Sequence, residues 1–294
     1  MTGAPRTIVL GAAGQVGSAL MAKLGDAGVG ITRQDANITV RTELISALDN
    51  AGPTSALINA AAYIDVERAE HERDLAFAVN ADAAGWAAAW AAERSIPFVH
   101  YSTEYVFPSG NGKPWREGDQ TEPLNAYGES KRAGEIAVWE AYPRGLVVRT
   151  SWVYGGNSND FVRKVLQLAA TQSSLSMVAD QWGSPTFAPA LAQATLRLTQ
   201  DADLASSIAG GIIHLASGRA ISRAEFARTI IDVGVAEGVL RGAVPVIDIS
   251  SDAYISAAQR PLHCVLDCAQ SVALGLHLGS WEESLPIAVR AVRS

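Results

Sequence analysis

Residues 11–17 (GAAGQVG) decide the fold of this 294-residue chain, because they join a strand-like segment to a helix-like one. The segment before them, Arg6–Leu10 (RTIVL), is a short apolar run rich in β-branched residues, which is typical of a buried strand. The segment that begins inside the motif, Gln15–Leu24, carries its apolar residues at helical spacing. A glycine-rich turn between a strand and a helix is the arrangement that binds a dinucleotide diphosphate, because free backbone N–H groups at the helix start face the phosphates.

Each glycine of this motif has its own task in such a turn. Gly11 permits the tight turn, Gly14 lets the backbone approach the diphosphate, and Gly17 lets the helix pack close to the strand. The spacing is Gly-x-x-Gly-x-x-Gly, and the chain has 26 glycines, so the position of the motif after the first strand carries the inference. We predict that a dinucleotide cofactor contacts Gly11, Gly14, Gln15, Val16 and Gly17.

The rest of the first half alternates short apolar strands with helical segments. Residues 29–32, 56–59, 97–101 and 146–149 are predicted strands, and residues 74–94 and 125–139 are predicted helices. This alternation predicts an α/β fold, a Rossmann-type doubly wound parallel sheet. After Trp152 the pattern changes to helices separated by Pro/Gly loops, which predicts a smaller, interleaved C-terminal substrate lobe. We therefore divide the chain into an NAD(P)-binding domain, residues 1–152, and a mainly substrate-binding lobe, residues 153–294, of which some segments return to the sheet.

Composition and charge narrow the class of protein. Hydrophobic residues make up 48% and charged residues 18% of the chain, which is ordinary for a globular protein. The net charge is -7 and no basic stripe is visible, so neither nucleic acid nor an anionic membrane is an expected partner. No apolar stretch approaches the roughly 20 residues of a membrane span. The first strand begins too early to leave room for a signal peptide, so we expect a cytoplasmic protein.

The residue after the second predicted strand bears on the choice between NADPH and NADH. Arg33 follows this strand directly, and no acidic residue stands at its tip. An acidic residue there would bind the ribose 2′-hydroxyl of NADH, whereas an arginine suits the 2′-phosphate of NADPH. We expect NADPH on this ground, with NADH as the alternative.

Tyr127 and Lys131 lie four residues apart and therefore share one face of a predicted helix. A phenol with its ordinary pKa near 10 is a poor acid–base group at neutral pH, and a nearby ammonium lowers that pKa. Tyr127 could then protonate a carbonyl oxygen as hydride arrives at its carbon. Thr103 follows the predicted strand 97–101, at the end where ligands of open α/β sheets bind, and its hydroxyl could stabilise the developing alkoxide. The predicted catalytic residues are Thr103, Tyr127 and Lys131.

In the order of these motifs the chain resembles the extended short-chain dehydrogenases, and more narrowly the dTDP-4-dehydrorhamnose reductases. The matching segments span nearly the whole chain. They are residues 11–17, 59–66 (NAAAYIDV), 69–70, 79–81 (VNA), 100–107 (HYSTEYVF), 123–131 (PLNAYGESK), 133–135, 149–154 (RTSWVY), 161, 180–186 (DQWGSPT), 260–261 and 266–267.

This resemblance implies a reaction and a set of contacts. The reaction is hydride transfer from NADPH to the C4 keto group of dTDP-4-dehydro-L-rhamnose, with Tyr127 as proton donor and Lys131 positioning it. Implied cofactor contacts, besides the glycine motif and Arg33, are Asn37, Ile38, Ala62, Tyr63, Ile64, Asn80, Tyr127 and Lys131. Implied contacts with the nucleotide-sugar substrate are Thr103, Glu104, Tyr105 and Trp152.

The chain departs from the family pattern in several places. Glu104 stands where aspartate is usual, Ile64 where threonine is usual, and Asn37 where an acidic residue is usual. Some members dimerise through magnesium held by glutamates after the Pro-Thr turn, but residues 185–190 carry no acid here. A homodimer is compatible with the resemblance, and a metal-bridged dimer is not expected. The five histidines lack ligand spacing, so no metal site is predicted.

Two other functions remain as alternatives. One is a non-catalytic NADP-binding regulatory subunit, which an intact Thr103, Tyr127 and Lys131 argue against. The other is a reductase or epimerase of a different nucleotide sugar. Glu67 and Glu70 lie close together in the sequence, and we expect them to form a solvated helix face.

Overall fold

The computed structural model describes residues 4–156, 160–208, 211–253 and 256–292. Its centre is a six-stranded parallel sheet in the order β10-β5-β4-β3-β1-β2. The strands are β1 (Arg6–Leu10), β2 (Gly28–Ile31), β3 (Thr54–Asn59), β4 (Phe98–Thr103), β5 (Leu146–Thr150) and β10 (Ile212–His214). The predicted Rossmann-type doubly wound sheet is confirmed.

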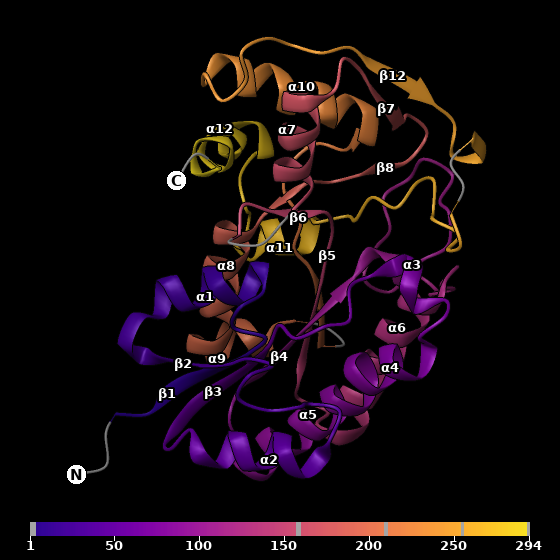
Figure 1. Cartoon of the computed structure of the whole chain (residues 1–294). Helices are drawn as coiled ribbons and strands as arrows, with labels where there is room; N and C mark the ends of the chain where they lie inside the picture. Colours follow the sequence, from indigo (N-terminus) through magenta and orange to yellow (C-terminus); the bar gives the residue numbers. More distant parts are fainter. Residues whose placement is uncertain (1–3, 157–159, 209–210, 254–255, 293–294) are drawn as a thin grey trace.

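Helices cover both faces of this sheet, because successive strand residues point to opposite sides. Val9 belongs to the core under α1 and α8, whereas Ile8 and Leu10 belong to the core under α2, α5 and α6. Figure 1 shows these two groups of helices on either side of the sheet. Their bounds are α1 (Gln15–Leu24), α2 (Arg41–Asn50), α5 (Ala83–Glu93), α6 (Ala126–Ala141) and α8 (Ala188–Gln200). Shorter helical pieces are η1 (Gly25–Ala27), α3 (Val66–Ala69), α4 (Arg73–Phe77), η3 (Glu104–Val106), α9 (Ala202–Ser206), η5 (Ser251–Ala253) and α11 (Ala269–Ala273).

The C-terminal lobe has its own core. It is built from α7 (Phe161–Thr171), α10 (Arg223–Ala236) and α12 (Trp281–Ala291), which bury a cluster around Phe226 and Trp281. Three two-stranded sheets complete it: β6 (Val153–Tyr154) with β9 (Thr186–Phe187), β7 (Leu175–Val178) with β12 (Val246–Ile249), and β8 (Trp182–Gly183) with β11 (Ile221–Ser222). In Figure 1 this lobe lies above the carboxyl ends of the central strands.

The two halves of the sequence interleave. β10 comes from the second half and pairs with β5, and α8 packs against α1. The division at residue 152 therefore stays a prediction about where the substrate lobe begins, while these two elements lie on the central sheet.

The long predicted helix over residues 74–94 is one helical stretch with a wider turn inside it. α4 leads into a π-helical turn, η2 (Ala78–Asp82), before α5 begins. π-helical turns inside α-helices occur often at functional sites. Here the turn carries Asn80, whose side chain is fully buried.

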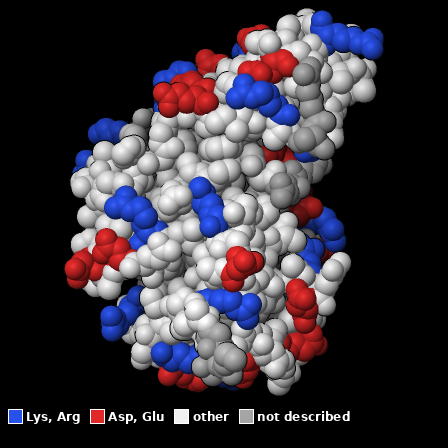
Figure 2. Space-filling model, turned by 90° about the vertical axis from the view of Figure 1, so that its left-hand side faces the viewer, with Lys and Arg blue, Asp and Glu red and all other residues white. Residues whose placement is uncertain are grey.

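The surface carries both signs of charge. On the face shown in Figure 2, Lys and Arg side chains are interspersed with Asp and Glu rather than gathered in one stripe. Within the described ranges, no helix is long and apolar enough to cross a membrane. The same residues contain no cluster of His, Cys, Asp or Glu that could hold a metal ion.

Candidate active site

The predicted site residues meet at the carboxyl edge of the central sheet. The glycine motif follows β1, residues 62–64 follow β3, and Thr103 ends β4. β1 lies between β2 and β3, so the strand order reverses beside it, and ligands of doubly wound sheets bind at such a switch point.

The glycine motif is packed as its sequence predicts. Gly11 has a φ of 75°, in the left-handed region that favours glycine, and a Cβ there would lie 2.6 Å from the backbone nitrogen of Ala61. A Cβ on Gly17 would clash with the Gly11 carbonyl oxygen and lie 2.8 Å from the Ala12 Cα. Both positions thus need glycine for close backbone approach.

The glycine motif, residues 11–17, and the start of α1 form a cradle that fits a dinucleotide diphosphate. α1 begins at Gln15 with Gly14 as N-cap, and no side chain caps this end. The helix start therefore offers backbone donors to an anion. The Oε1 atom of Gln15 is buried and has no hydrogen-bond partner among the described residues, and a buried polar atom of this kind is normally satisfied. A ribose hydroxyl or an N–H group of a bound dinucleotide could donate to this oxygen, while the backbone N–H groups at the start of α1 would donate to the diphosphate.

The remaining predicted cofactor residues line the same edge. Arg33 is exposed in the turn after β2, and Asn37 and Ile38 follow it before α2. Asn37 Oδ1 accepts hydrogen bonds from the Thr39 backbone and hydroxyl. Ile64 is 66% exposed beside the β3 end, as an apolar residue in place of a hydroxyl.

Asn80 is fully buried, and its contacts hold the segment after β3. Its Oδ1 accepts from the Tyr63 backbone N–H at 2.8 Å, and its Nδ2 donates to the Tyr63 carbonyl at 3.1 Å. Nδ2 also donates to Ser130 Oγ on α6 at 2.8 Å. The π-helical turn thus ties the predicted cofactor segment, residues 62–64, to the helix of Tyr127.

Thr103 and Glu104 form a buried pair at the end of β4. The Thr103 hydroxyl donates to Glu104 Oε2 at 2.8 Å, and both residues are about 5% exposed or less. Burial raises the pKa of Glu104 to about 7, against the hydrogen bond from Thr103 and the charge of Arg223, which lower it.

A pH-dependent stability follows from Glu104. Its folded-state pKa of about 7 exceeds the ordinary value of 4.5, so the folded state binds this proton more tightly. The stabilisation is complete below about pH 4.5 and is lost as the pH rises through 7. We expect Glu104→Gln to be more stable than the wild type at pH 8, by at most about 3 kcal/mol, with a smaller difference at pH 5. Urea unfolding at both pH values measures this.

The control for this prediction is Glu93→Gln. Its side chain is 74% exposed, so its difference from the wild type should not change between the two pH values. Equal changes in both variants would show that Glu104 titrates as an ordinary carboxyl.

Tyr127 lies on the first turn of α6, with its ring edge-on to Tyr105 at a centroid distance of 5.8 Å. Burial raises the pKa of its phenol above the ordinary value, and the charge of Glu104 adds to this, while a hydrogen bond with Thr103 opposes it. The prediction that Lys131 lowers this pKa is therefore wrong for this arrangement. A phenol that keeps its proton at neutral pH suits the role of proton donor.

Lys131 is 2% exposed and lies behind Tyr127 on the same helix. Its Nζ donates to the Tyr101 carbonyl at 2.6 Å and lies 3.3 Å from His100 Nε2. Burial lowers the pKa of Lys131 to about 8, and the charge of Glu135 opposes this. The ammonium is thus bound to β4.

Trp152 closes the site on the side of the C-terminal lobe. It has a φ of 42°, which is rare and strained for a residue other than glycine, and such strain clusters at functional sites. The indole packs where a Cβ on Gly183 would stand, 2.6 Å from Nε1. The guanidinium of Arg223 lies 3.7 Å from the ring centre. The charge of Arg223 also acts on Glu104 and Tyr105. No pattern in the sequence predicts this role, because Arg223 comes from α10 of the other lobe.

Glu67 and Glu70 do not form a solvated helix face, so that expectation is wrong. Glu67 accepts hydrogen bonds from residues 256–260, a segment that we call the strap. The donors are the Ser256 hydroxyl at 2.6 Å, the Ala257 N–H at 2.8 Å and Arg260 Nη2 at 2.8 Å. With the Ala258 N–H, they hold the pKa of this carboxyl at about 2, against the effect of burial.

Glu70 and Asn125 fasten the start of α6. Glu70 Oε1 accepts from the Ala126 N–H at 2.8 Å. Asn125 caps α6 through the Gly128 N–H, and its Nδ2 donates to the Gln259 carbonyl of the strap at 2.8 Å. The strap, α3 and the turn that bears Tyr127 are thus bound together, through contacts between residues 56 to 193 positions apart.

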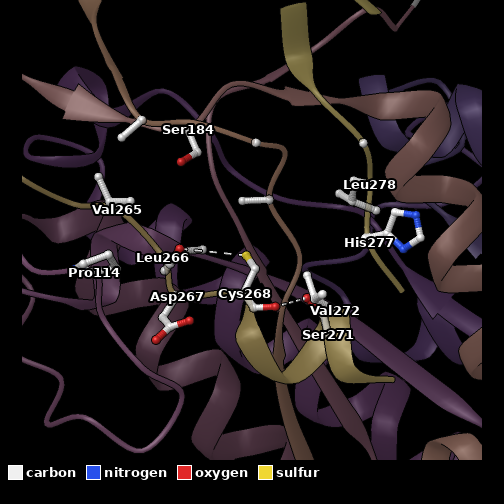
Figure 3. A pocket seen from close by; sticks show the side chains of 14 residues that line it. Pro114, Ser184, Val265, Leu266, Asp267, Cys268, Ser271, Val272, His277 and Leu278 are labelled. Carbon is white, nitrogen blue, oxygen red and sulfur yellow. Dashed lines mark hydrogen bonds between the residues drawn. The ribbon is translucent and has the colours of Figure 1, made fainter. Parts of the chain in front are cut away.

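A cavity of about 570 Å³ lies beside the C-terminal end of β10, between residues 216–220, 265–272 and 277–279. Figure 3 shows that Cys268 and Ser271 point toward their own backbone neighbours there. Thr103, Tyr127 and Lys131 are not among the described residues that line it. This cavity is separate from the catalytic group.

Comparisons with known proteins agree with this geometry. A family model described as the RmlD substrate binding domain matches residues 5–294. A dTDP-4-dehydrorhamnose reductase of Sinorhizobium fredii is 37% identical over 95% of both chains. A dTDP-4-keto-6-deoxy-D-glucose reductase of Streptomyces niveus is 36% identical over 89% of this chain and 88% of its own. The crystal structure of dTDP-4-dehydrorhamnose reductase from Bacillus anthracis in complex with NADP superposes with a TM-score of 0.89, at 30% identity and over 98% and 99% of the two chains. This chain therefore belongs to the family of the dTDP-4-dehydrorhamnose reductases, which the RmlD substrate binding domain defines.

Proposed function

We propose that this protein uses NADPH to reduce the C4 keto group of dTDP-4-dehydro-L-rhamnose to the alcohol of dTDP-L-rhamnose. The observation that carries the proposal is the group of the buried Thr103 and Glu104 with the partly buried Tyr127 at the switch-point edge, beside a glycine motif that fits a dinucleotide. Relatives named dTDP-4-dehydrorhamnose reductase support the proposed substrate, and the crystal structure of one of them in complex with NADP supports the proposed cofactor.

The residues of the cradle would hold the cofactor. The start of α1 would bind the diphosphate, Arg33 the 2′-phosphate, and residues 62–64 the nicotinamide half of the cleft. When bound, NADPH supplies the hydride for the keto carbon. No metal-bridged dimer is part of this proposal, because residues 185–190 offer no carboxylate. The cytoplasmic location stays a prediction.

The proton for the new hydroxyl would come from Tyr127. Its raised pKa keeps the phenol protonated, so Oη can donate to the keto oxygen as charge develops there. The Thr103 hydroxyl, which donates to Glu104 in the free protein, would turn its O–H to that oxygen when the sugar binds. Trp152, held by Gly183 and Arg223, would flank the sugar. The π electron pair of the C=O bond moves to the oxygen, and Tyr127 protonates this oxygen.

The test is NADPH oxidation followed by the nicotinamide absorbance, with dTDP-4-dehydro-L-rhamnose generated in situ. We expect oxidation that depends on the sugar and that is slower with NADH. NADPH binding without oxidation of any keto sugar would instead support the non-catalytic regulatory subunit.

A second candidate substrate is dTDP-4-keto-6-deoxy-D-glucose. The 36% identical relative bears the name of that reductase, and Glu104 and Ile64 depart from the usual residues close to the sugar. The same assay with both keto sugars in parallel decides between them by the ratio of kcat/KM.

The contacts between Glu67 and the strap predict that losing them weakens the binding of the nucleotide sugar and leaves the chemical step unchanged. Glu67 fixes Arg260, whose charge acts on Tyr105 in the cleft. Glu67→Gln turns one acceptor into a donor, and a hydrogen bond to a charged group contributes about 1.5–3 kcal/mol. We expect KM for the nucleotide sugar to rise about tenfold, with kcat and NADPH affinity within about threefold of the wild type. Steady-state kinetics against Glu93→Gln measures this, and an unchanged KM with a lower kcat would contradict it.

A further inference from the structure

A buried polar chain runs to Lys131 on the catalytic helix from Asn59 and His100, two residues that the proposed mechanism does not use. Asn59 ends β3, and His100 is its register partner on β4. Asn59, His100 and Lys131 are 2%, 0% and 2% exposed. Asn59 Nδ2 lies 3.1 Å from His100 Nδ1, and His100 Nε2 lies 3.3 Å from Lys131 Nζ. Buried polar chains of this kind stabilise one arrangement only if each donor faces an acceptor.

The backbone fixes the direction of this chain. The Ala61 N–H donates to Asn59 Oδ1 at 3.1 Å, so the carboxamide oxygen faces Ala61 and the NH₂ group faces His100. His100 Nδ1 must then accept. Burial and the charge of Lys131 lower the pKa of His100 well below its usual range, so the imidazole is neutral. Because a neutral imidazole carries one N–H, that proton is on Nε2.

The Nε2–H of His100 faces Lys131 Nζ, and the ammonium and the neutral amine of this lysine interact with it in different ways. A lysine ammonium has three N–H donors and no acceptor, whereas the neutral amine has a lone pair. The Tyr101 carbonyl takes one Nζ donor at 2.6 Å. In the neutral amine, the lone pair of Lys131 Nζ can accept a hydrogen bond from His100 Nε2–H. In the ammonium, an N–H of Nζ would face this donor and the two would repel each other.

We propose that His100 is a positioning residue for Lys131: its Nε2–H, fixed by Asn59, stabilises the neutral amine at the moment Lys131 gives up a proton. This rests on the proposed function. After Tyr127 has given its O–H proton to the keto oxygen, the phenolate would take a proton from Lys131 Nζ, which lies one turn further along the same face of α6. The Nζ–H bond breaks, its electron pair stays on nitrogen and accepts from His100 Nε2–H, and solvent later restores the ammonium.

Other charged groups around Lys131 do not take the place of His100. Glu135 on the same helix favours the ammonium but is bound to Arg149 of β5 at 2.7 Å and to Arg132. Glu104 of η3 acts on Tyr127. From α3 and α4, Glu70 binds the Ala126 N–H and Arg73 pairs with Glu129. His100 is thus the polar side chain that contacts Nζ within the described residues.

The first test needs no turnover. Nitrogen-15 NMR of ring-labelled histidine in the full-length wild type should show His100 with Nε2 protonated and Nδ1 unprotonated between pH 6 and 9, and His100→Gln identifies the resonance. A proton on Nδ1 would overturn the proposal. Because this readout is independent of the sugar, it stays decisive even if the proposed reaction fails.

The second test compares pH profiles. His100→Gln puts a carboxamide that can turn either way toward Nζ, so the fixed donor is lost. Asn59→Asp replaces the donor to Nδ1 with an acceptor, which draws the imidazole proton to Nδ1 and turns the Nε2 lone pair to Nζ. Both changes favour the ammonium, and we expect the alkaline limb of kcat to move up by about one pH unit in each.

A uniform loss of kcat at every pH, with the midpoint unchanged in both variants, would show a structural role only and overturn the proposal. Carbon-13 NMR of Lys131 Cε, assigned with Lys131→Met, gives the same midpoints without substrate. A rise of the Lys131 pKa in both variants supports the proposal even where turnover is too slow to measure.

Discussion

Tyr127→Phe should lower kcat by about a thousandfold while NADPH binds with nearly unchanged affinity. The substitution removes one oxygen, and that oxygen is the proton donor to the developing alkoxide. The ring would keep its edge-on packing against Tyr105, so the walls of the cleft should stay in place. Single-turnover measurement of NADPH oxidation, with cofactor affinity from fluorescence titration, separates the two effects.

Tyr142→Phe is the matched control. It removes a phenol hydroxyl at the C-cap of the same helix, where the hydroxyl donates to the Ile96 carbonyl at 3.2 Å, away from the catalytic group. We expect kcat of the control within about twofold of the wild type. Turnover retained by Tyr127→Phe on any accepted sugar would show that another group supplies the proton.

The sequence was sufficient wherever neighbours along the chain decide the structure. The strand Arg6–Leu10 and the helix Gln15–Leu24 have the predicted bounds, because a β-branched run and an apolar stripe are local patterns. The glycine motif was equally readable, since a turn between strand and helix needs small residues at fixed spacing. These features place the cradle and the end of β4 without any knowledge of distant contacts.

The sequence was insufficient where burial and distant partners decide. Glu67 and Glu70 have the pattern of a solvated face, yet the partners of Glu67 in the strap follow about 190 residues later. The pKa of Tyr127 was predicted from Lys131 alone, whereas burial and Glu104 dominate it in the fold. Desolvation depends on everything packed around a group, so one helix face cannot reveal it.

Arg223 illustrates the same limit for substrate recognition. Its neighbour in space, Trp152, belongs to the segment after β5, and the two are joined by a cation–π contact between the halves of the chain. Conversely, the positive φ of Trp152 is a backbone property that no residue pattern around it predicts. Both features come from the docking of the C-terminal lobe on the sheet.

Gly17→Ala should abolish tight NADPH binding and destabilise the fold. The new Cβ would overlap the Gly11 carbonyl oxygen and lie 2.8 Å from the Ala12 Cα, and neither is the flexible end of a side chain. Alanine in a helix gains about 1 kcal/mol over glycine, but overpacking against a rigid backbone costs roughly 1–3 kcal/mol or more. The cost of overpacking therefore exceeds the gain in helix propensity, and the N-terminus of α1 must move away from the turn after β1.

Such a shift acts on the cofactor more strongly than on stability, because a displacement of about 1 Å at a binding group can cost a hundredfold. We expect the Kd for NADPH to rise at least that much, and the melting temperature to fall by several degrees, roughly as 1–3 kcal/mol predicts. Gly242→Ala is the matched control, since nothing lies within 4 Å of its Cβ position and its φ is not positive. Isothermal titration of both variants decides the matter: if Gly17→Ala binds NADPH as tightly as Gly242→Ala, the close approach of α1 to Gly11 does not shape the cofactor site.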